Sequence, residues 1–211
     1  MRSNCIRKIM LGLCCIFMIV GAGCTRNIQV STNLQVQNPP ERKISKKVLV
    51  VMSKEQAETI ILEKPGAFSL DTFRFEAGKS ISSNLVTAMK TIFESADFAY
   101  ELPRDGGSFD HYILANYKNY KIEWGSTVFS PININVYIDY DLLDVNKGKV
   151  LAVSTDGSST WQRAGGEVVA LINPFVSILV TSSAIGQTWD QAVANSISQW
   201  MSELQKNLKK K

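Results

Sequence analysis

The sequence contains few of the residues that most metal centres and catalytic triads require. It has one histidine, His111, and four cysteines in 211 residues. Three of the cysteines lie within the first 23 residues, which have the pattern of an export signal, so Cys24 is the only cysteine expected in the mature protein. An exported domain with one cysteine cannot form an internal disulfide and must be stabilised by packing alone. We expect no cofactor, no metal ion and no enzymatic activity.

A strong excess of charge of one sign is also absent. The formal net charge is +4, and three of these positive charges, Arg2, Arg7 and Lys8, belong to the export signal, which contains no acid. The mature chain is therefore close to neutral, at about +1. Nucleic-acid binding uses a basic face that such a balance does not provide. We therefore expect no nucleic-acid partner.

The chain also lacks an N-terminal apolar run long enough for a permanent membrane span. The run from Ile9 to Val20 follows the positive start, and the small residues Gly21-Ala22-Gly23 follow the run. This order is typical of a bacterial secretory signal. A spanning helix needs about 20 apolar residues, which this run does not reach. Residues 1–23 are predicted to be a signal peptide.

The residues before Cys24 resemble a lipobox, the site at which bacterial lipoproteins are cleaved before a cysteine that carries the lipid. The motif here is Gly21-Ala22-Gly23-Cys24, with Gly21 where the family prefers leucine. The resemblance implies that Cys24 is lipidated, with palmitate among the acyl chains. Thr25 after the cysteine fits sorting to the outer membrane, as known for enteric lipoproteins. The alternative is ordinary cleavage after Ala22. We expect a lipid-anchored protein on the periplasmic face of the outer membrane.

Residues 24–47 have the composition of a linker. They are rich in Asn, Gln and Ser, contain Pro39-Pro40, and end in a basic cluster at 42–47. Apolar residues show no clear periodicity here, so we predict a flexible tether, with a short strand between Ile28 and Val36 left open. A single domain is expected at 48–211.

The predicted domain consists of a helix, a series of strands and a second helix. This order predicts an α+β fold, an antiparallel sheet of about four to five strands with two helices packed on one face. The predicted helices span Lys79 to Ala96 and Thr188 to Leu208. The predicted strands are Val48–Met52, Phe98–Leu102, His111–Trp124, Ile132–Leu142, Val150–Thr155 and Ser158–Arg163.

The clearest strand has one buried and one wet face. Between Ile132 and Leu142, apolar residues alternate with Asn133, Asn135, Tyr137 and Asp139. We predict that these four residues form a partner-binding face. Asp139 and its neighbouring acids lack the spacing of a calcium loop, so a solvated face is expected and not a metal site.

An apolar insert at 168–186 precedes the second helix. It follows Gly165-Gly166 and is interrupted by Asn173-Pro174, and its proline and length argue against a spanning helix. One interpretation is two short buried elements that complete the core. The other is an exposed loop that contacts a membrane or a partner protein. In that case the contact residues are Phe175, Val176 and Ile178.

Two further patterns point away from catalysis. Gly78-Lys79-Ser80 precedes a helix, but Phe73 stands where a phosphate loop needs its first glycine. Asp110 and His111 are adjacent in a predicted strand, where their side chains point to opposite faces, so they would not form a catalytic pair.

Three segments resemble small Gram-negative envelope lipoproteins. These segments are Phe-Glu-Ser-Ala-Asp-Phe at 93–98, Asp-His-Tyr-Ile-Leu at 110–114, and Tyr-Asp-Leu-Leu-Asp-Val-Asn-Lys-Gly-Lys-Val-Leu at 140–151. Together they are similar to YajG-like lipoproteins, with a fold like the TolB N-terminal domain. The penicillin-binding-protein activator and curli secretion lipoproteins share that plan, and LptE has a broadly similar layout. The resemblance implies a non-catalytic assembly or scaffolding role at the outer membrane.

Two functions follow from the sequence. The first is a lipid-anchored interaction or assembly module of the cell envelope, with an envelope protein as its partner and self-association left open. The alternative is a carrier that binds a lipid or other apolar ligand between the sheet, near Ile134 and Val136, and the helices.

Overall fold

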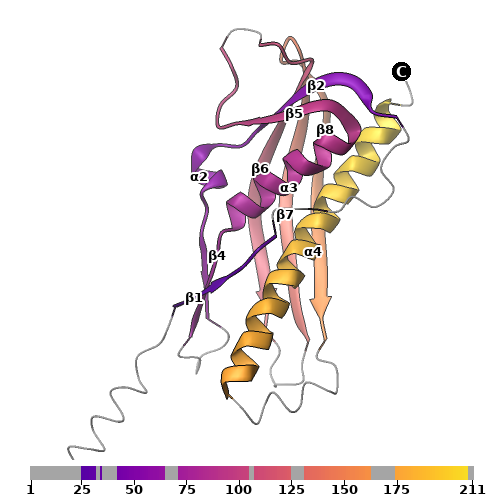
Figure 1. Cartoon of the computed structure of the whole chain (residues 1–211). Coiled ribbons are helices and arrows are strands. Elements are labelled where there is room, and N and C mark those ends of the chain that lie inside the picture. The colour runs from indigo at the N-terminus through magenta and orange to yellow at the C-terminus, as the bar shows by residue number, and fades with distance from the viewer. Residues whose placement is uncertain are drawn as a thin grey trace, which may run out of the picture.

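The computed structural model describes residues 25–31, 34, 42–64, 71–104, 107–124, 131–162 and 174–208, with the backbone alone at 174–181 and 208. The predicted signal peptide and Cys24 lie outside these residues. Figure 1 shows the arrangement of the elements. In chain order they are β1 Thr25–Ile28, β2 Ile44–Val51, α2 Lys54–Ala57, β3 Ile61–Glu63, β4 Thr72–Phe75, α3 Ala77–Ile92, β5 Phe93–Ala99, β6 His111–Glu123, β7 Ile132–Asp144, β8 Lys149–Trp161 and α4 Pro174–Leu208.

The α+β class is confirmed, but the main sheet is mixed and a second sheet is present. The main sheet has five strands in the order β5-β2-β6-β7-β8, and the second has three in the order β1-β4-β3. β2 runs parallel to both β5 and β6, whereas β6, β7 and β8 form an antiparallel meander. The expected all-antiparallel sheet is wrong because the chain returns from β2 to β5 through α3. Such a crossover brings the two strands into the same direction.

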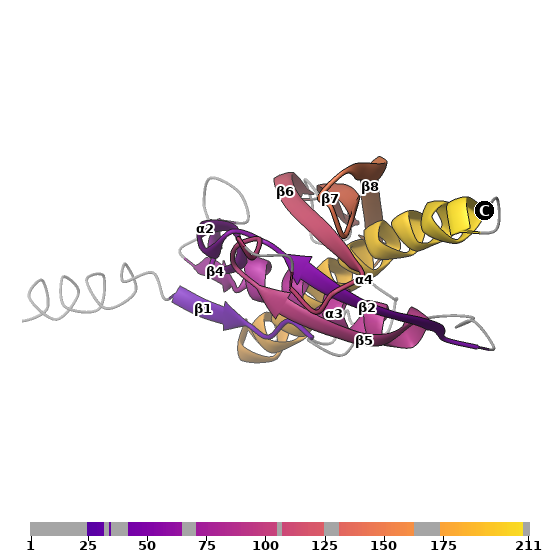
Figure 2. The same cartoon turned by 90° about the horizontal axis from the view of Figure 1, so that it is seen from above.

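The two long helices pack on one face of the main sheet. α3 lies against β5 and β2, and α4 lies along β7 and β8, as the view in Figure 2 shows. Their apolar stripes and the inward side chains of the sheet form one continuous core. Trp189 and Trp200 of α4 are completely buried in it. Because aromatic side chains bury so much area, these two residues contribute strongly to the docking of α4.

α3 is shorter than predicted because the residues that follow it pair as a strand of the main sheet. The helix ends at Ile92, and Phe93 already has extended backbone angles as the first residue of β5. The predicted helix continued to Ala96, since Phe93 and Ala96 also fit a helical apolar face. Pairing of β5 with β2, for example Lys47 opposite Ser95, overrides that local preference.

α4 is longer than predicted and includes much of the apolar insert. It runs without a break from Pro174, where a missing N–H is tolerated at the first helical position. Thr188, the predicted start of this helix, lies within it, and its hydroxyl donates to the carbonyl oxygen of Ala184 at 2.7 Å. Residues 174–186 thus form one helix with the residues that follow, whereas residues 168–173 of the insert lie outside the described residues. In the described part of the chain, no helix has the length and apolar character needed to cross a membrane.

β8 is one continuous strand, whereas two strands with a break at Asp156-Gly157 were expected. Gly157 faces α4, and a Cβ atom there would lie 2.6 Å from the backbone nitrogen of Ser196. The hydroxyl of Ser196 is 2.6 Å from that of Thr155 and 3.2 Å from that of Tyr140. The glycine thus permits close helix–strand contact, and the buried hydroxyls define its register.

The segment expected to be a tether is partly folded. β1 begins at Thr25 and pairs in parallel with β4, with Thr25 opposite Thr72. Ile28 is 4% exposed and belongs to the core. Residues 44–47 are part of β2. The prediction of a flexible tether is therefore wrong at residues 25–28 and 44–47. β1 has four residues, too few for a period to show, and residues 45–47 are polar and exposed although they belong to the eight-residue strand β2.

Candidate functional site

The four residues predicted to form one face of the sheet do lie on one face. Asn133, Asn135, Tyr137 and Asp139 all lie on the side of β7 that faces away from the helices, and each is half-buried between fully buried neighbours. Side chains of β6 and β8 flank them in register, with Asp139 between Asn116 and Ser154. The structure therefore brings together all four residues that the sequence assigned to partner binding; their role stays a prediction.

The polar groups on this face largely satisfy one another. Lys118 pairs with Asp139 at 3.2 Å, and Thr160 donates to Asn133 at 2.8 Å. A hydrogen bond from Ser154, together with the Lys118 ammonium, holds the pKa of Asp139 below its usual range. In the described residues, no three His, Cys, Asp or Glu side chains are grouped to hold a metal ion. The face has the character of a solvated surface with exposed ion pairs, which contribute little individually.

The same face is not wet along its whole length. Near β2 it carries a second apolar cluster, which contains the buried residues Leu49, Val51, Tyr112 and Leu143. Leu102 and Phe109, from the connection between β5 and β6, pack against this cluster. The available polar surface is therefore limited to the part of the sheet formed by β6, β7 and β8.

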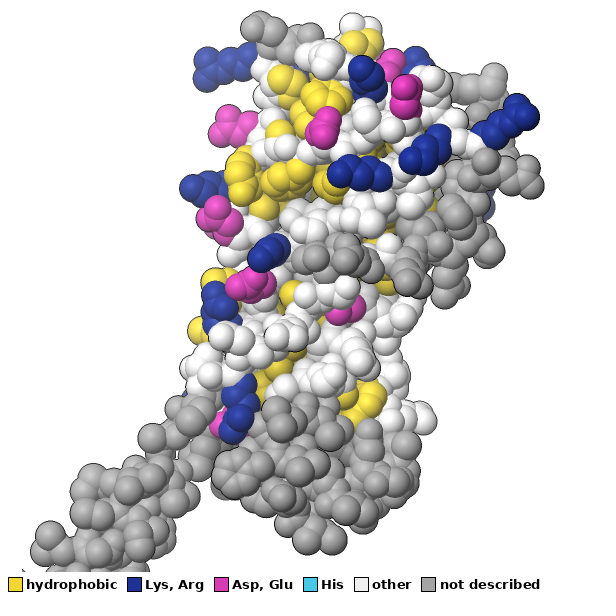
Figure 3. Space-filling view, viewed as in Figure 1, with side chains coloured by type: hydrophobic (Ala, Val, Ile, Leu, Met, Phe, Trp, Pro, Cys, Tyr) yellow, Lys and Arg dark blue, Asp and Glu magenta, His cyan; other side chains and the backbone are white. Residues whose placement is uncertain are grey.

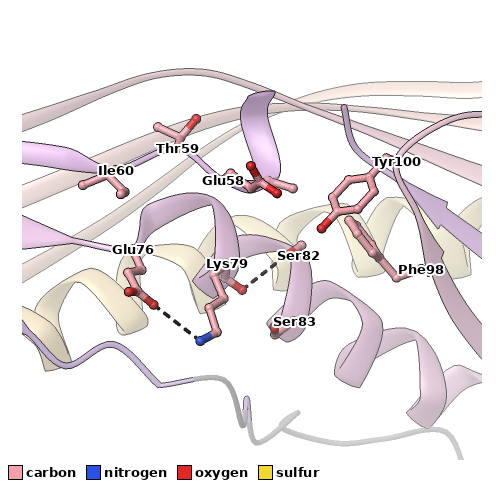
Figure 4. Close-up of a pocket in the computed structure, with 10 residues that line it drawn as sticks. Glu58, Thr59, Ile60, Glu76, Lys79, Ser82, Ser83, Phe98 and Tyr100 are labelled. Atoms are coloured by element: carbon pink, nitrogen blue, oxygen red, sulfur yellow. Dashed lines mark hydrogen bonds and ion pairs between the residues drawn. The ribbon is translucent and has the colours of Figure 1, made fainter. Parts of the chain in front are cut away.

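A cleft that sequence reasoning missed lies between the α2–β3 connection, the start of α3 and the end of β5. We call it the α2–α3 cleft; its volume is about 440 Å³. Figure 4 shows Glu58, Thr59 and Ile60 along one side and Phe98 with Tyr100 on another. The Phe98 and Tyr100 rings meet edge to face at 5.2 Å. Such a mixture of apolar walls and a few polar groups is typical of binding sites.

The cleft also carries exposed apolar side chains. Ile60 and Tyr100 of its lining are each 46% exposed, and Leu62 of β3, which is not part of the lining, is 61% exposed. Figure 3 shows that apolar side chains gather over α3, with charged side chains beside them. Exposed apolar groups around a concave surface are a common feature of protein contact sites. Ile60 lies in a segment whose sequence has no clear periodicity, which is why it was not predicted.

The start of α3 is used for packing and not for anion binding. The backbone N–H of Gly78 donates to the carbonyl oxygen of Thr59 at 3.1 Å. A Cβ atom at Gly78 would lie 2.6 Å from the carbonyl oxygen of Ala57. Gly78 is therefore explained by the close approach of α2 to α3. Lys79, the next residue, pairs with Glu76 at 3.4 Å.

Asp110 holds the start of β2. Its carboxylate accepts hydrogen bonds from the backbone N–H of Lys47 at 2.8 Å and from the Lys46 ammonium at 2.9 Å. The Lys47 hydrogen bond and then the Lys46 ammonium hold its pKa below the usual range. These two hydrogen bonds give Asp110, the residue directly before β6, a structural role.

The place expected for an apolar ligand is filled by protein side chains. Ile134 and Val136 are completely buried and belong to the same core as Trp189 and Ile197 of α4. The α2–α3 cleft has other lining residues. Cys24 lies outside the described residues, as do the side chains of Phe175, Val176 and Ile178, although the backbone of these three is helical.

The sequence matches no protein-family model and no curated protein. Among solved structures, the PelC dodecamer from Paraburkholderia phytofirmans is 17% identical, covering 77% of this chain and 93% of that chain with a TM-score of 0.38. A putative lipoprotein from Caulobacter crescentus is 15% identical, covering 60% and 84% with a TM-score of 0.35. Both superpose too loosely to bear on this chain.

A third solved structure gives a firmer comparison. Protein XCC0632 from Xanthomonas campestris, of the family DUF330, is 11% identical, and the alignment covers 89% of this chain and 99% of that chain with a TM-score of 0.53. At this identity the likeness concerns the fold alone. The chain therefore shares its fold with XCC0632 over nearly the whole length of that protein.

Proposed function

We propose that this protein is a lipid-anchored lipoprotein of the bacterial outer membrane whose periplasmic domain is a non-catalytic interaction or assembly module. The observation that carries the proposal is the position of β1. Thr25 directly follows Cys24 and is already paired with Thr72 of β4. One residue spans less than about 4 Å, so a lipid on Cys24 would hold the domain at the membrane surface with no spacer.

The location of β1 indicates which end of the domain would face the bilayer. Phe73 of β4 stacks on Trp124, which follows β6, with ring centroids 5.8 Å apart. Tyr120 near the end of β6 donates to Glu63 of β3 at 2.7 Å. The start of β1 therefore lies at the end of the molecule where β6 finishes.

Figure 1 shows the first turns of α4 extending past the strands at this same end. These turns begin at Pro174 and have an apolar sequence, which includes Phe175, Val176 and Ile178. Contact of this segment with the membrane, or with a partner held there, agrees with an anchor at Cys24. Beyond the first turn, whose N–H groups have no partner within the helix, the helical backbone satisfies its own hydrogen bonds and so suits this role.

The α2–α3 cleft is our candidate for the contact with an envelope protein. Its lining comes from the α2–β3 connection, the start of α3 and the end of β5. Its exposed Ile60 and Tyr100 offer apolar area, whereas the polar groups of the sheet face already bind one another. A carrier function receives less support, since the core near Ile134 is filled.

The anchor is tested by labelling cells with a palmitate analogue. The wild-type chain should take up the label and sediment with outer membranes, and Cys24→Ser should do neither. Cys14→Ser, within the signal, is the matched control and should still be labelled. Label retained by Cys24→Ser, or an unlabelled soluble wild-type protein, would refute the anchor, and an N-terminus at Gly23 would identify cleavage after Ala22.

The interaction role is tested by placing a photo-crosslinking residue at Tyr100, at Tyr137 on the sheet face, or at the exposed Lys54 as a control. We expect a defined protein adduct from position 100 that disappears when Ile60→Ser is added. An adduct only from position 137 would move the contact to the sheet face. If no position gives more adduct than position 54, the interaction role is rejected.

A further inference from the structure

A polar cavity lies between the N-terminal strand and α4. Its walls come from β1 with the residues that follow it and from the middle of α4. We call it the Asp190 cavity; its volume is about 580 Å³. This size lies within the range of small-molecule sites. The lining residues are Asn27, Gln29, Val30, Ser31, Ser182, Ser183, Gln187 and Asp190.

Asp190 is the charged side chain of this lining. Its carboxylate accepts a hydrogen bond from the backbone N–H of Ser31 at 2.7 Å and one from the hydroxyl of Ser80 at 3.4 Å. Both donors are neutral. In the described part of the chain, no lysine or arginine forms an ion pair with Asp190. The cavity therefore contains a half-buried negative charge that no lysine or arginine among the described residues neutralises.

Two basic side chains next to residues of this site are already paired: Arg26 precedes Asn27 of the lining, and Lys79 precedes Ser80, which donates to Asp190. Arg26 of β1 pairs with Asp71 at 3.0 Å, and Lys79 of α3 pairs with Glu76. Burial raises the pKa of Asp190 to about 6, with the hydrogen bonds from Ser31 and Ser80 opposing the shift. The carboxylate is thus mostly ionised at neutral pH, in surroundings that favour a compensating cation.

A buried amide oxygen, Oδ1 of Asn84, lies beside this network. Asn84 of α3 is 1% exposed, and its amide donates to the carbonyl oxygen of Ser31 at 3.1 Å and to the hydroxyl of Ser80 at 3.4 Å. Its own Oδ1 atom, although buried, accepts no hydrogen bond from the described residues. An unpaired buried acceptor is costly. Together with Asp190, it makes this region rich in acceptors.

The composition of the cavity selects the charge and the chemistry of a ligand. One carboxylate with hydroxyl and amide groups matches a single positive charge that carries several N–H donors. Calcium needs six or more oxygen ligands, commonly several carboxylates, which this lining does not provide. The lining also contains no aromatic ring on which a sugar could stack. We propose that the Asp190 cavity binds a primary ammonium group.

Two sources supply this chemistry: a membrane lipid with an ethanolamine headgroup, and a soluble small amine. The lipid source rests on the proposed function, because Asn27 in the cavity wall is only three residues after Cys24. In an anchored protein the cavity would therefore lie close to the bilayer. The ammonium site itself depends only on the residues of the cavity.

The test is calorimetric titration of the purified full chain in detergent with glycerophosphoethanolamine. Glycerophosphocholine is the matched control ligand, since its quaternary ammonium has the same charge and no N–H. We expect saturable binding of the first ligand and at least tenfold weaker binding of the second. Binding of the first should also weaken as the pH falls below about 6, because protonation removes the charge of Asp190.

Asp190→Asn keeps the shape of the side chain and an acceptor for Ser31, so we expect it to fold and to bind at least tenfold more weakly. Asp156→Asn, at an exposed position on β8, is the matched control and should bind as the wild type does. Ser183→Leu narrows the cavity without touching the carboxylate, and it should also weaken binding. Far-ultraviolet circular dichroism confirms the fold of each variant.

Vesicles then separate the two sources. Binding that requires vesicles with ethanolamine headgroups, and is absent with choline headgroups, supports the lipid. Equal affinity for the soluble amine supports the free ligand. No saturable binding in either arm, equal binding of the choline control, or unchanged binding by Asp190→Asn would overturn the proposal. Cys24→Ser should bind the soluble amine normally, so failure of the anchor leaves this result intact.

Discussion

The contact between β8 and α4 predicts a large effect for the smallest side-chain addition. In Gly157→Ala, the new Cβ atom would lie 2.6 Å from both the backbone nitrogen and the Cβ of Ser196, where ordinary contact is 3.4–4 Å. The clash is with backbone, so rotation of a side chain cannot relieve it. α4 would have to move away from β8 by roughly 1 Å to restore normal contact.

The expected loss can be worked from two contributions. Overpacking of this kind costs about 1–3 kcal/mol. The movement would also stretch the 2.6 Å hydrogen bond between Thr155 and Ser196, and an unsatisfied buried hydroxyl costs about 1–3 kcal/mol. We expect the free energy of unfolding to fall by about 2–6 kcal/mol. For a domain of this size, at about 2–4 °C per kcal/mol, that corresponds to a decrease in Tm of roughly 4–24 °C.

Urea unfolding of the purified protein measures this loss, with Gly107→Ala as the matched control. At Gly107 the new Cβ would lie 3.4 Å from the ring of Phe109, which is ordinary contact, so a change below about 1 kcal/mol is expected. A Gly157→Ala protein within about 0.5 kcal/mol of the wild type would refute the packing of α4 on β8 in this register. Equal losses at both glycines would refute the argument as well.

Three further predictions follow from other parts of the fold. Ile28→Ala should lower the free energy of unfolding by about 2–4 kcal/mol in the same urea assay, because Ile28 is buried. Gln29→Ala, at an exposed position, is the control and should change it little. Small effects of equal size would contradict the packing of β1 into the domain. Burial raises the pKa of Asp190 to about 6 from 3.8, so its stabilising contribution is full below about pH 4 and is lost as the pH rises through 6. Between pH 4 and 7, the stability of Asp190→Asn relative to the wild type should therefore improve by about 1 kcal/mol, after allowance for solvent screening, and a constant difference across this range would contradict the assignment. Gly78→Ala should lower Tm by several degrees, because its Cβ would meet the backbone of Ala57, and an unchanged melting curve would contradict the close α2–α3 packing.

The long periodic elements were predictable because their apolar residues recur often enough for the helix or strand period to be recognised. The alternation from Ile132 onward is strong enough to define β7 and to assign Asn133, Asn135, Tyr137 and Asp139 to one face. The gap between the predicted strands Ile132–Leu142 and Val150–Thr155 contains the turn at Asn146-Lys147-Gly148, where the Asp144 carboxylate accepts hydrogen bonds from the backbone N–H groups of Asn146 and Gly148. Such features depend on neighbours within a few residues.

The boundaries and the small sheet were not predictable in this way. β1, β3 and β4 have three or four residues each, too few for a period to be visible. The α2–α3 cleft and the Asp190 cavity were missed for a different reason. Their residues are far apart in sequence, for example Ser31 and Asp190, and become neighbours only when β1 and α4 pack together.

The sequence by itself predicts an export signal and a cysteine available for a lipid, and it was sufficient for the α+β class and the wet face of β7. These depend on composition and on periodicity over a few residues. Only the tertiary structure decided that β2 is parallel to its neighbours, that α3 gives way to β5 at Phe93, and that Thr25 belongs to the folded domain. It also decided that Asp190 lies in a cavity without a basic partner in the described chain. The physical reason is that strand pairing and desolvation are set by residues distant in sequence, whose contacts outweigh local preference.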